Sequence, residues 1–556
     1  MTAAAISNRD ASAAGVLLLT GVVLAALTEA VASTVLSLGR SDIIGDIHAT
    51  SDEFAWLDIG YTTLKLVGFM VAPWLLSQVR PVSLIIVSTL AMGLACCIAA
   101  ATVWLELLVA LRVVQGFAGG VLLVAGQTVI FLAYPRSRQP LLQALFAIGA
   151  VVAPATVAPA LQGWLVDNHS WTWIFFGNVP LSLAAAGLLL TAGDRVGAKT
   201  THRPFDWIGF VLLSITLSCS TYVLSQGSRW DWLEEPRIFW LTAIGIAALL
   251  AFLGQQVLGR GLLDFTLFGS SDFSFAFIVS FVAGAALFGS AFLIPSFAIS
   301  VLAFTPTDAG QLLLPSGMLF AGALLVAAFL IQVRRIPPFA TVPFGILMIM
   351  AAMWMLSGST SESGADDMMA AVLLRGLGLG FLFLSITLIA FSDLDRRKLA
   401  AGIGLFNTGR QLGGLMGVAA LQTMIDHNVV ANVAVLGANV TTGGAAVLER
   451  LAATTAMLTA KGLDPVAAGR AATNLVGRMV TGQSTVIAFD AAFAAVALLF
   501  LFAAPLLIGI KIVLARHAKM RTIRRVELPQ AHPKSGIHGR TFDRPVPPVL
   551  RESLKL

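Results

Sequence analysis

Charged side chains are scarce in this sequence of 556 residues: Asp, Glu, Lys and Arg make up 12%, against roughly a quarter in soluble proteins. Tyrosine is nearly absent, with 3 residues against 34 phenylalanines, and 57% of the chain is hydrophobic. A soluble protein of this composition would need many buried helices with almost no polar faces. The scarcity excludes the soluble class and predicts an all-α integral membrane protein.

Residues that bind metals, nucleotides or nucleic acid are also missing or misplaced. Cysteine occurs 3 times, always within apolar runs, and the 7 histidines lack the spacing of metal ligands. The glycines within 376–380 belong to an apolar run rather than to a nucleotide-binding loop. The net charge of +6 lies mostly in loops and in the C-terminal tail, so we expect no nucleic acid partner. No cofactor is predicted, and the proton motive force is the expected source of energy.

Apolar runs long enough to cross a bilayer recur along the chain. The required length of about 20 residues selects fourteen candidate spans. They lie at 15–38, 54–76, 82–103, 106–132, 140–163, 172–193, 207–227, 237–257, 273–301, 309–332, 338–356, 367–391, 399–424 and 484–511. Most of the 35 basic residues fall on one side if both termini are cytoplasmic, which predicts that orientation in a cell inner membrane.

The predicted spans divide into two six-helix halves plus two inserted helices. The expected parts are a cytoplasmic N-tail at 1–14, an N-terminal half at 15–193, the inserted helices at 207–257, a C-terminal half at 273–511 with a long periplasmic loop at 426–483, and a basic cytoplasmic tail at 512–556. A weak repeat supports the two halves, because Arg112 and Arg375 each begin a glycine-rich span. Parallel repeats of this kind are typical of transporters.

Glu29 lies midway through the first span and is the predicted proton-binding residue. A carboxylate in a low dielectric takes up a proton more readily than in water, because burial disfavours its charged form. It could accept a proton from one side of the membrane and release it to the other. The alternative is a permanently paired acid that only positions the helix.

A polar face runs along the second span. Asp58, Tyr61, Thr62 and Lys65 share one side of a helix, because Tyr61, Thr62 and Lys65 follow Asp58 by three, four and seven residues. We expect Asp58 to take part in proton coupling and the other three to line the substrate cavity, with Lys65 free to pair with Glu29 across helices. The alternative leaves Asp58 in water at the outer interface, with Lys65 snorkelling.

Arginines inside a span need a polar partner or a cavity, since the centre of a bilayer costs them about 3 kcal/mol on insertion scales. Arg112 shares a helix face with Gln115 and Gly116. We expect Arg112 to modulate the proton site and Gln115 and Arg375 to line the cavity. The alternative for Arg112 is a purely structural contact between helices.

Further motifs extend over the chain. The fifth span carries Pro154 and Pro159 among small residues, which predicts a bendable helix that packs closely on a neighbour. Other motifs lie at 171–180, 205–209, 407–414 and 490–493. With Arg112-x-x-Gln115-Gly116 and the stretch 149–163, they resemble the major facilitator superfamily, and more narrowly its fourteen-span drug:proton antiporter family. The resemblance covers nearly the whole chain apart from the tail.

The resemblance implies two halves that rock about a midplane cavity, and a proton-coupling role for the arginine of the fourth span. The residues that carry its structural motifs are Gly116, Pro154, Pro159, Gly163, Trp173, Asn178, Pro180 and Arg410. Two stretches depart from the family's pattern. The loop at 73–81 lacks the acidic gate residue, and Thr28 rather than an Asp follows Leu27, which moves the acid one place to Glu29. The sequence resembles a divergent branch.

The predicted function is proton-coupled export of small amphipathic or drug-like compounds across the inner membrane by alternating access. The expected partners are the substrate, protons and the lipid bilayer, and a periplasmic adaptor protein is left open. The alternative is proton-coupled transport of one specific metabolite, such as a siderophore or an organic anion bound by Lys65 and Arg112. An enzyme is not expected, because the sequence has no nucleophile–base or metal constellation.

Overall fold

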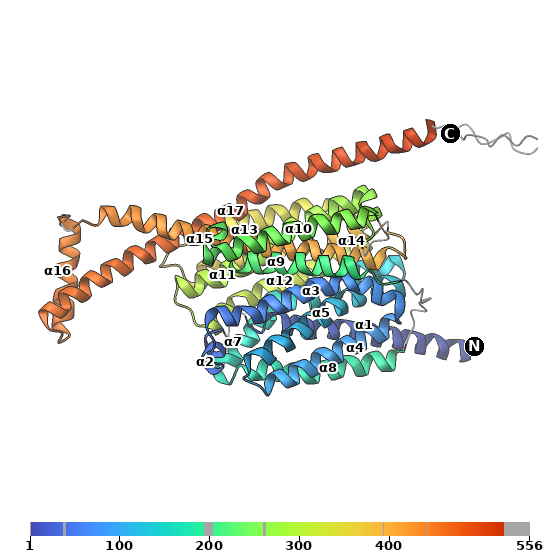
Figure 1. The fold of residues 1–556 in the computed structure, drawn as a ribbon, viewed down its shortest axis with the longest axis horizontal. Coiled ribbons are helices and arrows are strands. Elements are labelled where there is room, and N and C mark those ends of the chain that lie inside the picture. Colours follow the sequence, from blue (N-terminus) through green and yellow to red (C-terminus); the bar gives the residue numbers. More distant parts are fainter. Residues whose placement is uncertain are drawn as a thin grey trace, which may run out of the picture.

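The computed structural model describes residues 2–36, 40–193, 204–258, 263–392, 394–441 and 443–527, and the regular structure within these ranges is helical (Figure 1). Long apolar helices lie side by side in a single bundle. Thirteen of the described helices are long and apolar enough to cross a membrane. The predicted all-α membrane architecture is therefore confirmed.

The helices before residue 193 form the first group. They are α1 (Thr2–Thr34), α2 (Arg40–Asp46), α3 (Ser51–Gln78), α4 (Pro81–Ala100), α5 (Leu105–Ala133), α6 (Gln139–Ala147), η2 (Ile148–Val157), α7 (Ala158–Asn168) and α8 (Thr172–Ala192). α3 crosses α5, α4 contacts both α5 and α8, and α8 packs on α1. Helix α3 begins at a capping box, in which Thr50 and Glu53 satisfy each other's backbone N–H groups.

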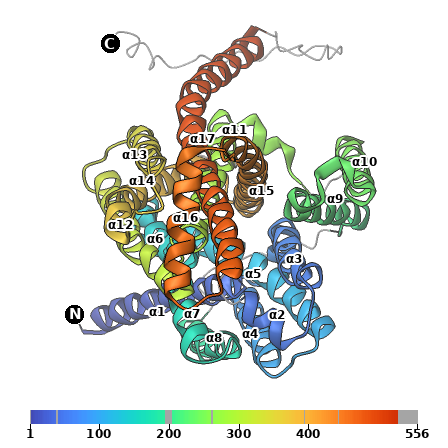
Figure 2. The ribbon, with the colours of Figure 1, turned by 90° about the vertical axis from the view of Figure 1, so that its left-hand side faces the viewer.

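Helices α9 (Trp207–Gln226) and α10 (Pro236–Leu258) pair with each other at the side of the bundle. Only α9 makes extensive contacts with the other membrane helices, chiefly with α3 and also with α15 (Figure 2). Their peripheral position is that of two helices added to a bundle that is packed without them.

The third group follows residue 263. Its long helices are α11 (Ser271–Ser300), α12 (Pro306–Gln332), α13 (Val342–Leu356), α14 (Ala365–Phe391), α15 (Leu399–Asn439), α16 (Ala445–Ala460) and α17 (Pro465–Glu527). Short 3-10 turns lie at Arg136–Arg138, Ser228–Trp230, Trp232–Glu234, Phe265–Gly269 and Pro338–Ala340. Helix α15 is the predicted thirteenth span. It is less apolar than the other thirteen because it carries Asn407, Arg410 and Gln411, yet it packs against α3, α11 and α17.

The segment 426–483 forms continuous helices rather than a loop with separate surface helices. Helix α15 runs on to Asn439 and α17 already begins at Pro465, so a helical hairpin capped by α16 projects from one end of the bundle (Figure 1). The breaks fall at Gly443–Gly444 and at Gly462, whose φ of 94° suits glycine. Helix α17 spans 63 residues, from this hairpin through the bundle to Glu527.

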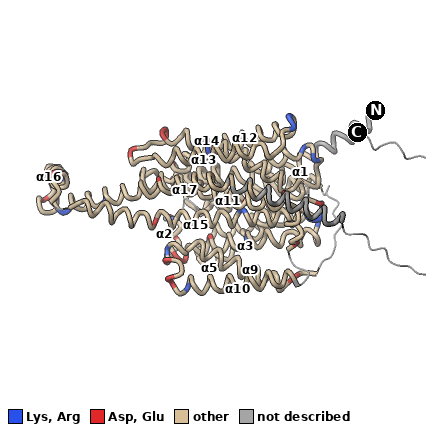
Figure 3. Tube along the Cα trace, turned by 90° about the horizontal axis from the view of Figure 1, so that it is seen from above, with Lys and Arg blue, Asp and Glu red and all other residues tan. Residues whose placement is uncertain are grey.

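Charged residues gather near the two ends of the bundle, and few lie between them (Figure 3). Arg112 and Arg375 are exceptions, since both are among the largest fully buried side chains. Buried charges of this kind need partners, and their surroundings define the candidate site.

Candidate functional site

Glu29 forms a buried ion pair with Lys65. Glu29 is 1% exposed in α1, and its Oε1 lies 2.5 Å from Nζ of Lys65 in α3. The hydroxyl of Tyr61, one turn earlier in α3, donates to the same oxygen at 2.9 Å. Each charge needs the other, because a single buried charge without a partner is strongly destabilising.

Arg112 joins this pair through the ring of Tyr61. The guanidinium carbon of Arg112 lies 4.1 Å from the ring centroid, within the range of a cation–π contact. Its Nη1 donates to the Ala32 carbonyl at 2.7 Å and to Oε1 of Gln115 at 3.0 Å. Its Nε and Nη2 have no hydrogen-bond partner among the described residues. Tyr61 therefore contacts the acid with its hydroxyl and the arginine with its ring.

Glycines in α5 bring these helices together. A Cβ added at Gly116 would lie 2.8 Å from the carbonyl carbon of Tyr61, and one at Gly120 would lie 3.1 Å from that of Lys65. A Cβ at Gly119 would meet Cγ of Glu29 at 2.8 Å. Real Cβ atoms essentially never come this close at Gly116 and Gly119 and seldom do at Gly120, so glycine at these positions lets α3 and α1 approach α5.

The other two residues of the predicted polar face on α3 differ in their exposure to solvent. Thr62 is buried in α3, whereas Asp58 is exposed and forms no ion pair with a described residue. Arg375 lies inside the third group of helices, where its Nε donates to Oγ of Ser290 in α11 at 2.7 Å. Its two terminal nitrogens have no hydrogen-bond partner in the described part of the chain.

Two of the remaining motif residues, Asn178 and Gly163, make contacts between helices, whereas two others face outward. Asn178 of α8 donates to the backbone oxygen of Thr28 at 3.0 Å, next to Glu29. Gly163 packs on α12, where an added Cβ would lie 2.8 Å from the Pro306 oxygen. Trp173 is 52% exposed, and Pro180 is exposed on the same helix, so both face outward from the bundle.

The proline-containing helix departs from the α form. Between Gln139 and Asn168 the chain stays helical, but the ten residues of η2 adopt the wider π form, and Pro154 lies within it. Proline removes a backbone donor, and an enlarged turn is one way to accommodate the loss. η2 contacts α1 on one side and α12 on the other, so the irregular segment lies between the two helix groups.

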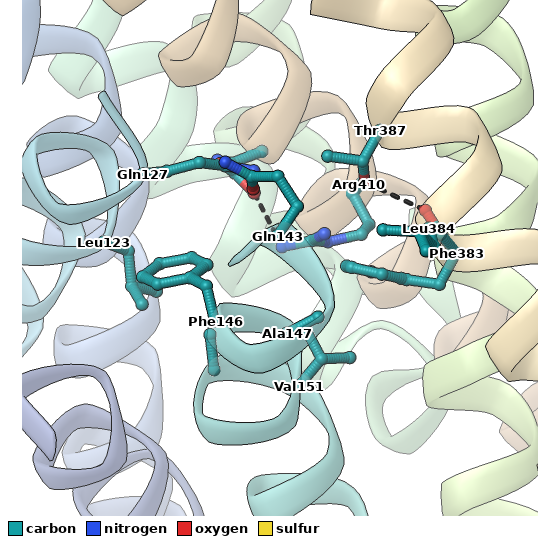
Figure 4. Close-up of a pocket in the computed structure, with 12 residues that line it drawn as sticks. Leu123, Gln127, Gln143, Phe146, Ala147, Val151, Phe383, Leu384, Thr387 and Arg410 are labelled. Atoms are coloured by element: carbon teal, nitrogen blue, oxygen red, sulfur yellow. Dashed lines mark hydrogen bonds between the residues drawn. The ribbon is translucent and has the colours of Figure 1, made fainter. Parts of the chain in front are cut away.

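A pocket lies between the first and third helix groups (Figure 4). It has room for about one water molecule, so the bundle is nearly closed around it. Its lining residues are Leu123, Gln127, Gln143, Phe146, Ala147, Ala150, Val151, Phe383, Leu384, Thr387, Asn407 and Arg410.

A second, wider pocket lies one turn farther along α5 and α14. Leu132 and Leu394 line it, with Arg136 and Arg396 as its charged residues. Phe131 and Phe391 line this second pocket and form a cluster of three rings with Phe406. Phe391 contacts Phe131 and Phe406 edge to face, at centroid distances of 5.4 and 5.1 Å.

Comparison with known proteins shows which family the chain belongs to. The profile described as Major Facilitator Superfamily matches residues 18–418, most of the chain. The chain belongs to the major facilitator superfamily. Multidrug export protein EmrB of Haemophilus influenzae is 27% identical over 420 residues, which cover 74% of this chain and 81% of that protein. Fatty acid resistance protein FarB of Neisseria gonorrhoeae is 24% identical, covering 87% and 93%.

A solved structure shows the same fold. The inward-facing, unoccupied bacterial homologue of the human lysosomal transporter Spinster superposes with a TM-score of 0.53 at 14% identity, over 90% of this chain and 97% of that one. The resemblance to the drug:proton antiporter branch of the superfamily, stated from the motifs, is confirmed. This chain is a multi-pass membrane transporter and not an enzyme.

Within the superfamily fold, the structure gathers five of the predicted residues and separates others. Glu29, Tyr61, Lys65, Arg112 and Gln115 form one cluster. Arg375 lines neither pocket, while Arg410, expected only as a motif residue, lines the central one.

Sequence reasoning missed Gln127 and Gln143, which line the central pocket. Their signal was an uncharged amide inside an apolar span, which is less conspicuous than a charge because its cost in the membrane is smaller.

The cluster of Phe131, Phe391 and Phe406 gives a first prediction. Phe391→Ala should open the second pocket to the central one, which lies one turn away, since two edge-to-face contacts worth about 0.5–1.5 kcal/mol each are lost. In a variant without Cys96, Cys97 and Cys219, a cysteine at Thr387 should react roughly tenfold faster with an impermeant maleimide applied from the Arg136 face.

Phe329→Ala is the matched control, because Phe329 is 51% exposed on α12. Equal labelling rates for Phe391→Ala and the control would show that the rings do not separate the pockets.

Proposed function

We propose that this transporter exports small amphipathic or drug-like compounds in exchange for protons, by alternating access of its two halves to a central pocket. The observation that carries the proposal is the buried pair of Glu29 and Lys65, held by Tyr61 beside Arg112. The names of two relatives, a multidrug export protein and a fatty acid resistance protein, support export of amphipathic or drug-like compounds.

The ion pair offers a physical basis for coupling. When Glu29 takes up a proton, Lys65 keeps its charge but loses its partner. A buried charge left unpaired costs about 3–5 kcal/mol, which is enough to shift a two-state equilibrium strongly. Protonation thus favours a conformation in which Lys65 reaches water or another partner.

Other groups around Glu29 are given supporting roles. Arg112 modulates the proton site through Tyr61, and Asp58 is the exposed acid through which a proton reaches it from the end of α3. Thr62 and Gln115 contribute to the polar wall of the path that opens in other conformations, and Arg375 plays the corresponding part in the second half.

The location of the cluster suits this mechanism. Glu29 packs on Gly119, one turn of α5 before Leu123, which lines the central pocket. Four residues of helix span about 6 Å, so a shift at the proton site acts directly on the pocket wall. We propose that both termini lie in the cytoplasm and that the protein resides in the inner membrane, because this orientation puts most of the basic residues on the cytoplasmic side. A periplasmic adaptor could contact the projecting hairpin.

Transport by purified protein tests the proposal. In liposomes with an imposed pH difference, a fluorescent amphiphile should accumulate against its gradient and be released when nigericin collapses that difference. Accumulation that persists without the pH difference would contradict proton coupling, and an absence of any flux would contradict export of amphiphiles.

A further inference from the structure

The hydrogen bonds of the central pocket run in one direction across the two halves. Nη2 of Arg410 donates to Oδ1 of Asn407 at 2.6 Å, and Nδ2 of Asn407 donates to Oε1 of Gln127 at 3.3 Å. Nε2 of Gln127 then donates to Oε1 of Gln143 at 3.2 Å. The side-chain carbonyl oxygens of Asn407, Gln127 and Gln143 therefore each accept a hydrogen bond.

At both ends of this series of hydrogen bonds, the side-chain groups without a partner are N–H donors. Nε2 of Gln143 is buried without a hydrogen-bond partner in the described residues, and Gln143 is 1% exposed. At the other end, the guanidinium of Arg410 has five N–H groups, and only its Nη2 bonds to a described residue. A buried polar group without a partner costs free energy, so the pocket favours an occupant that accepts hydrogen bonds.

The charged residues that line the two pockets are all arginines, so both pockets carry positive charge. Among the described residues, Arg410 is the only charged one that lines the central pocket, and Arg136 and Arg396 are the only charged ones that line the second pocket. No carboxylate of a described residue forms an ion pair with Arg410. A cationic amphiphile would meet repulsion at each stage, whereas an anionic one would be attracted.

The remaining wall of the central pocket is apolar. The ring of Phe383 lies 4.8 Å from the guanidinium carbon of Arg410, and Phe146, Leu123 and Val151 line the side nearer α5 and η2. A site with a few directed donors and an otherwise apolar wall matches a ligand with one polar head and an apolar body.

We propose that the central pocket binds the oxyanion head of an amphipathic anion, such as a carboxylate on an alkyl chain, between Arg410 of α15 and Gln143 of α6. The proposal rests on the export function above and names its substrate class. Because the two donors belong to different halves of the transporter, the head group bridges them when the pocket is closed. The pocket must widen to admit the alkyl chain.

Binding to purified protein in nanodiscs, without any pH difference, tests the head group alone. The ligands are laurate, dodecyltrimethylammonium and dodecanol, which share a twelve-carbon chain. Laurate should bind most tightly. Arg410→Gln should weaken laurate binding about 10- to 100-fold, the value of a charge-assisted hydrogen bond, and leave dodecanol unchanged. Arg410→Lys should recover part of the lost laurate affinity, because lysine keeps the positive charge but cannot donate two parallel hydrogen bonds as a guanidinium does.

Gln143→Glu is the second variant, and it keeps the acceptor for Gln127. It replaces the free donor with an anion, so laurate binding should fall and dodecyltrimethylammonium binding should rise. Arg478→Gln, on the exposed part of α17, is the control for the loss of one positive charge. Discs with phosphatidylglycerol identify the natural source of the oxyanion: competition with laurate assigns it to a lipid, and no competition assigns it to a soluble amphiphile.

Equal affinities for laurate and dodecyltrimethylammonium, or the same laurate affinity in Arg410→Gln and Arg478→Gln, would overturn the proposal. The export function fails separately, if no amphiphile moves in response to a pH difference. A transporter that moves only cations with protons would keep its proposed export function and lose this inference.

Discussion

Glu29→Gln is expected to abolish transport driven by a pH difference. The substitution keeps the shape of the side chain and its contact with Tyr61, but it removes the carboxylate that pairs with Lys65 and accepts from Tyr61. Counterflow without a proton gradient should persist, since exchange of substrate across the membrane needs no net proton movement. The measurement compares the two modes of transport in the same liposomes.

Stability must be separated from coupling in this test. Glu29→Gln leaves Lys65 buried without its counter-charge, at a cost of about 3–5 kcal/mol. The double variant Glu29→Gln/Lys65→Gln removes both charges and should recover most of the lost thermal stability, because two neutral amides can bond to each other. It should remain uncoupled.

A double variant that is stable and still accumulates substrate against its gradient would refute Glu29 as the proton site. A double variant as unstable as Glu29→Gln would show that the ion pair does not account for the instability.

Gly116→Leu should prevent the bundle from forming correctly. An added Cβ already lies within 3 Å of the Tyr61 backbone, and the larger side chain must push α3 away from α5. Overpacking costs about 1–3 kcal/mol where neighbours can yield, and backbone yields least. The same displacement would separate Tyr61 from Arg112. We expect a sharp loss of monodisperse protein in size-exclusion chromatography and a large fall in the melting temperature.

Gly187→Leu is the matched control, because nothing lies within 4 Å of a Cβ added at that position in α8. It introduces the same side chain into a membrane helix and should leave yield and melting temperature nearly unchanged. Equal behaviour of the two variants would mean that α3 and α5 do not depend on their close approach.

Much of the fold could be predicted from the sequence, because the length of an apolar run and the basic residues of a loop are local signals. Fourteen spans follow from counting apolar residues, and even the weakly apolar α15 was found that way. The projecting hairpin was not predicted as continuous helix. The polarity of 426–483 showed that it leaves the bilayer, but not that helix α15 continues without a break to Asn439.

The candidate site could be predicted only in part. Charges inside spans stand out, so Glu29, Lys65 and Arg112 were found. Helix periodicity gave the face shared by Tyr61 and Lys65, but not the contact of that face with α1 and α5. The bond network of the central pocket joins the neighbouring helices α5 and α6 to α15, which is far from them in sequence. Nothing local to Gln127, Gln143 or Asn407 shows that they meet. Such contacts come from the packing of the two halves, which a single sequence does not contain.

The π segment η2 gives the transporter a way to turn a pocket wall without unfolding a helix. It separates α6, which carries Gln143 and Phe146, from α7, which is held against α12 at Gly163. Adding or removing one residue from a helical register rotates everything beyond it by about 100°. If the wide turn closed into the α form while α7 stayed in place, the α6 side chains would swing around the helix axis. A change of helical register within η2 would therefore change which side chains of α6 face the pocket.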